Sequence, residues 1–195
     1  MQLVAARIPA SNDGRCPRVG IDGPDGAGKT YFADELAALL RAQRRSVVRV
    51  SLDDFHNTRD VRYRRGRDSP EGFWADSYNY ERFHIDVIAP FSPGGSRTYR
   101  TAAHDLATDA ILNPVPRSAA PGTVLIVDGI FLHRNEFAAT WTCPSSSMFH
   151  LLKRLGGWLN ETEPTRILNI PACDATSKHS GGTSENARRS SGQRY

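Results

Sequence analysis

A phosphate-binding pattern lies near the start of the chain, where residues 18–30 read Arg-Val-Gly-Ile-Asp-Gly-Pro-Asp-Gly-Ala-Gly-Lys-Thr. Gly23, Gly28, Lys29 and Thr30 fit the pattern G-x-x-x-x-G-K-[ST]. Its glycines let a loop curl so that backbone N–H groups point at phosphate oxygens, while the lysine reaches the outer phosphates and the hydroxyl holds Mg²⁺. We therefore expect a nucleotide phosphate site formed by Gly23, Pro24, Asp25, Gly26, Ala27, Gly28, Lys29 and Thr30.

The elements on both sides of this loop have the order that the pattern requires. Val19–Asp22 is a short apolar run suited to a buried strand, and 31–43 has the apolar spacing of one helical face. A helix that begins near Gly28 adds its N-terminal partial positive charge to the same phosphates. Strand, glycine loop and helix together favour a phosphate site over a chance match.

Carboxylates follow two further predicted strands. The β-branched run 46–52 predicts a strand that delivers Asp53 and Asp54, and the apolar run 123–128 predicts a buried strand that ends in Asp128. In open α/β sheets the ligand lies beyond the carboxyl ends of the strands, so these positions are candidates for function. An aspartate that caps a helix or a turn is the structural alternative for Asp53. Thr30 and Asp128 are the predicted metal-binding residues.

Composition limits the class of protein. With 195 residues, 39% hydrophobic and 24% charged, the chain is long enough for one packed α/β domain. A net charge of +4 suits phosphorylated small molecules as well as nucleic acid, and no nucleic-acid motif is present. Three widely spaced cysteines argue against disulfides and zinc, and no apolar run of about 18 residues predicts a membrane span. We expect a cytoplasmic protein, with its oligomeric state left open.

Other segments give weaker predictions. Residues 1–17 contain several turn-forming residues and are expected to form a flexible leader. The polar, arginine-rich and aromatic segment 57–80 is expected to be a loop with substrate contacts, and 80–89 a short helix. The cluster of Arg62, Arg64, Arg65 and Arg67 fits a solvated face better than a phosphate site.

Over roughly residues 18–141, the chain resembles the uridine kinase and phosphoribulokinase group of P-loop kinases. The run Ser-Leu-Asp-Asp-Phe-His at 51–56 looks like the group's S-x-D-x-F-[YH] element, in which the aspartate, here Asp53, accepts the proton of the attacking hydroxyl. Tyr99 and His104 look like the pair that holds the nucleoside, and Asp76 resembles the aspartate that binds sugar hydroxyls. Asp128 stands where many relatives have glutamate.

The resemblance implies a parallel sheet flanked by helices and a transfer of the γ-phosphoryl group of ATP to the primary hydroxyl of a nucleoside. ATP and Mg²⁺ would be required, with Lys29 and Asp53 as the catalytic residues. Two alternatives stay open. The acceptor could be another small alcohol, such as pantothenate, a phosphosugar or a nicotinamide nucleoside, or the chain could be a non-catalytic nucleotide-binding remnant.

The sequence leaves the family pattern after Trp141. Relatives continue with a buried strand and an arginine-rich lid helix, but this chain gives Thr-Cys-Pro-Ser-Ser-Ser and a tail rich in Ser, Gly, Thr and Arg. Trp is encoded only by TGG and every Thr codon starts with AC, so a displaced reading frame across Trp141 and Thr142 must read GAC, which encodes Asp. In the same displaced frame, the codons that follow permit Leu-Ser-Val-Phe-Leu-Asp-Val-Pro. We expect 142–195 to be an irregular, mostly disordered, out-of-frame tail that arises from a mutated gene or a sequence error, with a divergent but genuine C-terminus as the alternative. The kinase domain at 18–141 is then incomplete, because it lacks its C-terminal strand and lid, and the activity of this chain is left open. Reading the DNA across the Trp141 codon tests this hypothesis.

Overall fold

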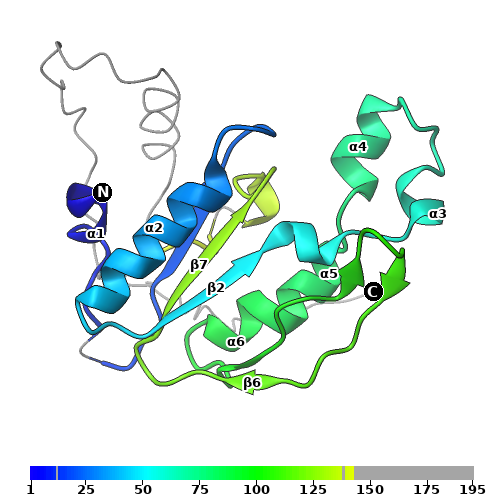
Figure 1. Ribbon diagram of the computed structural model, residues 1–195. Coiled ribbons are helices and arrows are strands. Elements are labelled where there is room, and N and C mark those ends of the chain that lie inside the picture. Colours follow the sequence, from blue (N-terminus) through cyan, green and yellow to red (C-terminus); the bar gives the residue numbers. More distant parts are fainter. Residues whose placement is uncertain (12, 138, 143–195) are drawn as a thin grey trace, which may run out of the picture.

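In the described part of the chain, the centre of the fold is a parallel sheet of three strands. β1 (Arg18–Asp22) and β2 (Val47–Ser51) lie on either side of β7 (Val124–Gly129), as Figure 1 shows. The register pairs both Ile21 and Ser51 with Asp128, so the carboxyl ends of the three strands lie level at one edge. The computed structural model describes residues 1–11, 13–137 and 139–142.

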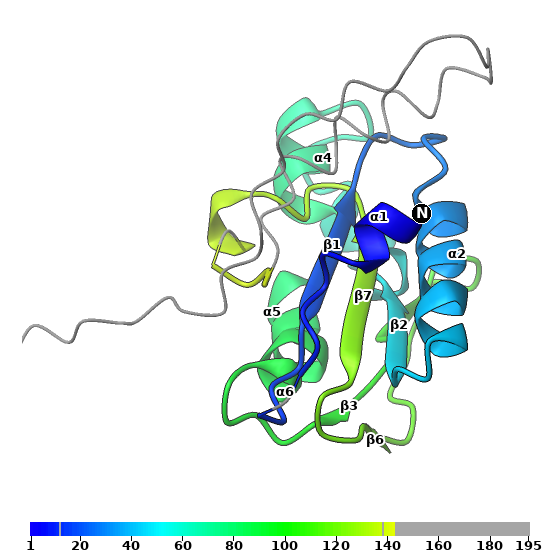
Figure 2. The same cartoon turned by 90° about the vertical axis from the view of Figure 1, so that its left-hand side faces the viewer.

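Helices cover both faces of this sheet, which confirms the predicted architecture (Figure 2). α2 (Lys29–Ala42) packs on one face, and its buried residues Phe32, Leu36 and Leu40 follow the helical spacing of the sequence. A continuous helical segment covers the other face and comprises α5 (Tyr80–Phe83), the π-helical turn η2 (His84–Ile88) and α6 (Ala89–Phe91). All six residues of β7 are buried between the two layers.

The first residues of the chain pack against the domain. α1 (Gln2–Ala5) follows Met1, and Val4, Ala5 and Ile8 are buried in the same cluster as the apolar face of α2. The guanidinium of Arg45 donates hydrogen bonds to two backbone carbonyls of the leader, those of residues 8 and 9. The apolar patch of this stretch thus covers part of α2, whereas the sequence analysis expected a flexible leader.

The segment 57–80 contains two short helices, where the sequence analysis expected a loop. α3 (Arg59–Arg62) is followed by α4 (Pro70–Asp76). The Ser69 hydroxyl caps α4 by accepting the N–H of Gly72 at 3.0 Å, and proline at the first helical position needs no such partner. Ser-Pro is therefore a helix start at this place.

Short elements make up the rest of the described chain. A 3₁₀ turn, η1 (Leu52–Phe55), continues directly from β2. The remaining elements are two small antiparallel pairs and one more 3₁₀ turn: β3 (Thr98–Tyr99) with β6 (Arg117–Ser118), β4 (His104–Asp105) with β5 (Ala110–Ile111), and η3 (Asn135–Phe137).

The outer edge of β1 meets the last residues that the structure describes. The backbone N–H of Thr142 donates to the Arg18 carbonyl at 2.9 Å, and the Thr142 hydroxyl accepts the Arg18 N–H at 2.9 Å. The expected tail, apart from Thr142, lies outside the described residues.

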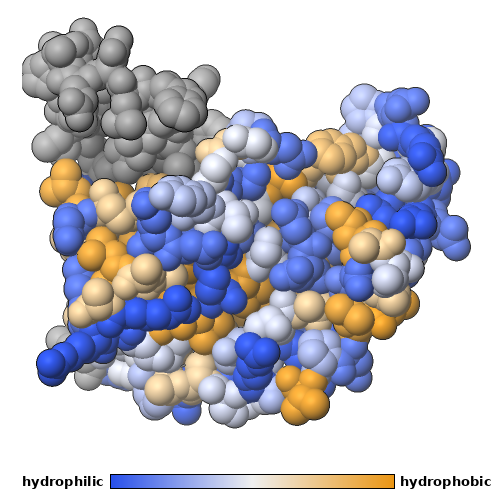
Figure 3. Space-filling view, in the orientation of Figure 1, coloured by the Kyte–Doolittle hydropathy of each residue, from blue (hydrophilic) through white to orange (hydrophobic). Residues whose placement is uncertain are grey.

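The surface is mostly hydrophilic on the face that Figure 3 shows, with hydrophobic areas that are small and scattered. Within the described part of the chain, none of the helices combines the length and the apolar character needed to cross a bilayer.

Candidate active site

The phosphate loop has the backbone conformation that its glycines were expected to provide. Gly26 and Gly28 have φ of +73° and +76°, a left-handed conformation that other residues rarely adopt. Gly28 is also the N-cap of α2, so the loop ends at the positive end of the helix dipole. Lys29 is 8% exposed, and its Nζ donates to the Pro24 carbonyl at 2.9 Å, which folds the side chain back over the loop.

The two predicted metal-binding side chains lie in contact. The Thr30 hydroxyl donates to Oδ2 of Asp128 at 2.7 Å, and Asp128 is 1% exposed. Arg49, on β2, forms a hydrogen-bonded ion pair with Oδ1 of the same carboxylate. Arg49 was not predicted as a site residue, because an arginine within a β-branched run is expected to point to solvent.

Asp53 is held by an aromatic residue from a distant segment. The hydroxyl of Tyr78 donates to Oδ1 of Asp53 at 2.9 Å, and the His56 ring lies 4.4 Å from the Tyr78 ring. Burial raises the pKa of the Tyr78 phenol, and the charge and hydrogen bond of Asp53 add to this shift. The phenol therefore stays a proton donor to Asp53. No motif pointed to Tyr78, which is 25 residues away from Asp53.

Three carboxylates gather at the ends of β2 and β7. Burial raises the pKa of the Asp54 carboxyl, and the nearby charges of Asp53 and Asp128 raise it further. Such crowding of negative charge favours a cation. The described residues hold no group of three or more His, Cys, Asp or Glu side chains that could bind a metal ion unaided. Mg²⁺ commonly takes one or two protein oxygens together with phosphates and water, so Thr30 and Asp128 fit this ion when a nucleotide is present.

Asp22 connects the end of β1 with the chain that leaves β7. Its carboxylate accepts the backbone N–H groups of Phe131 at 3.1 Å and His133 at 2.9 Å. Burial opposes ionisation, but the hydrogen bonds and charge of His133 hold the pKa of Asp22 below its usual value. Phe131 has φ of +66°, a strained conformation that these bonds help to maintain. From the sequence, Asp22 was expected only to end a strand, and this role was not predicted.

The predicted nucleoside residues have different surroundings. His104 is 4% exposed, its Nε2 lies 3.1 Å from Asp109, and its Nδ1 has no partner among the described residues. The N–H of Ala103 donates to the Asp54 carbonyl at 2.8 Å, which places His104 near the carboxylates. Tyr99 packs its ring 5.3 Å from that of Phe91, within the hydrophobic core.

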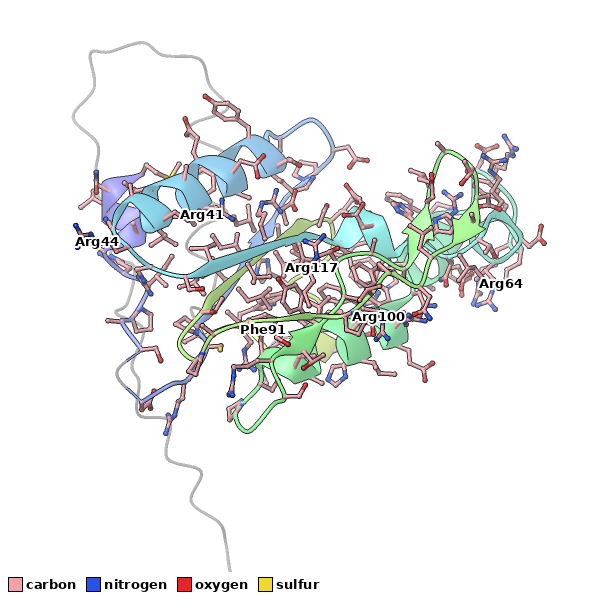
Figure 4. The ribbon with its side chains drawn as sticks, turned by 60° about the horizontal axis from the view of Figure 1, so that its bottom comes forward. Arg41, Arg44, Arg64, Phe91, Arg100 and Arg117 are labelled. Atoms are coloured by element: carbon pink, nitrogen blue, oxygen red, sulfur yellow. The ribbon has the colours of Figure 1, made fainter. Side chains whose placement is uncertain are left out.

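Asp76 has two cationic partners. It is 2% exposed, and it accepts hydrogen bonds from Arg64 and, at 2.8 Å, from Nε of Arg65. The bond from Arg64 is the largest of the effects that lower the pKa of Asp76. Figure 4 shows Arg64 at the periphery, beyond the small hairpins. The carboxylate predicted to bind sugar hydroxyls is thus engaged by arginines of its own segment.

Comparisons with known proteins agree with the fold. No family model and no curated protein sequence matches the chain. Solved structures do match. One, described as a possible uridine kinase from Bacillus stearothermophilus, has a TM-score of 0.60 and 23% identity over 72% of this chain and 74% of that one. Another, described as a fructose transport system kinase from a Silicibacter species, has a TM-score of 0.53 and 23% identity over 73% and 69%. The chain has a P-loop kinase fold.

The P-loop kinase fold confirms the predicted fold class, and both neighbours fit the uridine kinase and phosphoribulokinase group that the motifs resemble. At this identity the likeness extends to the fold alone. The roles of Lys29, Thr30, Asp53 and Asp128 therefore depend on the geometry described above and stay predictions.

Proposed function

We propose that this chain binds ATP with Mg²⁺ and has the site of a small-molecule kinase, which transfers the γ-phosphoryl group to a primary hydroxyl. The observation that carries the proposal is the meeting of the phosphate loop and the strand-end carboxylates. Thr30, the last residue of the phosphate pattern, touches Asp128, and the charges of Asp128 and Asp53 both act on Asp54. One edge of the sheet thus offers a phosphate cradle, a metal-side carboxylate and a base.

The residues divide the chemistry among them. The loop N–H groups and Lys29 hold the phosphates, once Lys29 exchanges its contact with the Pro24 carbonyl for phosphate oxygen. Thr30 and Asp128 would hold Mg²⁺, which neutralises phosphate charge when bound. Asp53 accepts the proton of the acceptor hydroxyl. The acceptor oxygen forms a bond to the γ-phosphorus while the bond from that phosphorus to the bridging oxygen of ADP breaks.

Tyr78 has a positioning role in this scheme. Its hydroxyl occupies one oxygen of the Asp53 carboxylate, which leaves the other oxygen available for the acceptor. Because the phenol comes from a buried ring that is 5% exposed, it fixes the direction of the carboxylate. A fixed base is the geometric requirement for proton transfer.

The acceptor that fits the sequence motifs is a nucleoside, in the manner of uridine kinases, and His104, whose buried Nδ1 has no hydrogen-bond partner among the described residues, is its candidate polar contact. A second candidate is another small alcohol. The observation in its favour is the pairing of Asp76 with Arg64 and Arg65, because a carboxylate that already has two cationic partners has less capacity for a ribose diol.

Nucleotide binding by the full chain tests this function first. We expect calorimetry with ATP and Mg²⁺ to detect binding in the wild type and in Arg44→Gln, whose side chain lies at the far end of α2 (Figure 4). Lys29→Met should bind at least about tenfold more weakly, because it loses the charge that meets the phosphates. Absence of ATP binding in the wild type would contradict the proposal.

Phosphoryl transfer to a panel of uridine, cytidine, pantothenate and phosphosugars then identifies the acceptor. A preference for the nucleosides supports the first candidate, and a preference for the other alcohols supports the second. ATP binding without turnover on any acceptor would indicate a non-catalytic nucleotide-binding protein.

A further inference from the structure

One arginine contacts both residues assigned to the metal. Arg49 lies on β2, an edge strand, and its side chain is 15% exposed. One nitrogen of its guanidinium pairs with Oδ1 of Asp128, and another lies 3.4 Å from the backbone oxygen of Thr30. A cationic side chain therefore sits where the proposed function requires a metal ion.

Both oxygens of the Asp128 carboxylate are engaged in this arrangement. Arg49 holds one, and the hydroxyl of Thr30 holds the other at 2.7 Å. A carboxylate that is 1% exposed needs a counter-charge, because desolvation strongly disfavours an unpaired ion. Arg49 supplies this charge before any ligand arrives.

Arg49 already contacts a second carboxylate. Its Nε lies 3.0 Å from Oδ1 of Asp34, a residue of α2 whose side chain is 64% exposed. If Asp128 turns to a metal ion, the guanidinium keeps an ionic partner. The exchange therefore leaves no buried charge unpaired.

We propose that Arg49 is a built-in counter-cation for Asp128, which competes with the divalent metal and is released toward Asp34 when a metal–nucleotide complex binds. The inference rests on the proposed function for the identity of the natural ligand. Its physical basis is the repulsion between a guanidinium and a divalent cation that share one carboxylate. The arrangement makes the site favour metal that arrives with phosphates over free metal.

Binding of Mn²⁺ alone to the full chain, followed by electron paramagnetic resonance of the free ion, measures this competition. We expect Arg49→Gln to bind Mn²⁺ at least about tenfold more tightly than the wild type, since the competing charge is gone. Arg49→Lys, which keeps the charge, and Arg44→Gln, which removes a charge elsewhere, should stay within about twofold of the wild type. Equal or weaker Mn²⁺ binding by Arg49→Gln would overturn the inference.

A second variant tests the same competition without touching the buried pair. Asp34→Asn replaces an exposed carboxylate, and so it should fold normally while leaving Arg49 more firmly on Asp128. We expect Mn²⁺ binding about twofold to fivefold weaker than in the wild type. Unchanged or tighter binding would contradict the exchange, even if Arg49→Gln failed to fold.

The two proposals fail in different ways. Loss of ATP binding in the wild type speaks against the proposed function alone, because the Mn²⁺ measurements need no nucleotide. Intact ATP binding together with an unchanged Mn²⁺ affinity in Arg49→Gln speaks against the counter-cation alone.

Discussion

The contact between Tyr78 and Asp53 predicts an asymmetry in stability. Tyr78 is 5% exposed and donates its hydroxyl to Oδ1 of Asp53 at 2.9 Å, whereas the aspartate is exposed. Asp53→Ala leaves the buried hydroxyl without an acceptor, and we expect it to lower the free energy of unfolding by about 1–3 kcal/mol. Tyr78→Phe keeps the ring and leaves a carboxylate that water can solvate, so its cost should be under about 1 kcal/mol.

Two further variants test whether the hydrogen bond between Tyr78 and Asp53 causes this asymmetry. Asp53→Asn keeps an acceptor oxygen in place, and its stability should lie within about 0.5 kcal/mol of the wild type. The double variant Asp53→Ala with Tyr78→Phe removes both partners. Its unfolding free energy should match that of Tyr78→Phe alone, which corresponds to a coupling of about 1 kcal/mol or more.

Urea denaturation at pH 7.5, followed by tryptophan fluorescence and circular dichroism, provides the comparison. If the effects of the two single substitutions add within about 0.5 kcal/mol, Asp53 and Tyr78 are not coupled, because independent sites behave in that way. Equal stability of Asp53→Ala and Asp53→Asn would also show that Tyr78 does not depend on this acceptor.

Three other predictions follow from the described contacts. In a version of the chain that is active, Asp53→Asn should leave ATP binding largely intact and lower turnover at least about 100-fold, which is the scale of a lost general base. Unchanged turnover in steady-state kinetics would exclude Asp53 as the general base. Gly20→Ala should lower the free energy of unfolding, measured by urea denaturation, by about 1–3 kcal/mol, because an added Cβ would lie 2.9 Å from the indole of Trp141. An added Cβ at Gly14 makes no such close contact, so the cost of Gly14→Ala comes from its φ of +76°. Burial lowers the pKa of His56, so protonation of this imidazole disfavours the folded state. The contribution of neutral His56 to the free energy of unfolding is therefore complete above the unfolded-state pKa of about 6.5, and it is lost as the pH falls from that value toward the folded-state pKa. Unfolding free energies between pH 7.5 and 5.5 should therefore decline less in His56→Gln than in the wild type, and parallel curves would contradict this.

The sequence predicted the elements that have a local, periodic signal. The apolar spacing in α2 and the continuous apolar run in β7 are confirmed, because each reflects a helix or strand buried along its length. The level ends of the strands follow from their parallel arrangement, which brings Asp128 beside Ser51 in the register. That geometry allowed the carboxylates to be predicted together.

Contacts between distant segments could not be predicted in the same way. Asp22 meets the N–H groups of Phe131 and His133 over separations of 109 and 111 residues, and Arg49 meets Asp128 over 79. No periodicity records such pairs, because each depends on how strands are ordered in space. The helix at 70–76 is a different case. Its start signal, Ser69 followed by proline, was present but was outweighed by the polar composition of the segment.

The change in sequence after Trp141 falls where the chain has reached the side of β1 that pairs with no other described strand. Trp141 lies against Gly20 and donates its indole N–H to the Leu132 carbonyl at 2.9 Å, and Thr142 then bonds to both backbone groups of Arg18. A chain that continued from Thr142 along β1 would add a parallel strand. The displaced reading frame permits Asp-Leu-Ser-Val-Phe there, a sequence suited to a buried strand, whereas the actual one soon places a proline, which has no N–H to donate to a strand ladder. A shift of frame at this codon would therefore alter the sheet that supports the phosphate loop, and not only an extension at the surface.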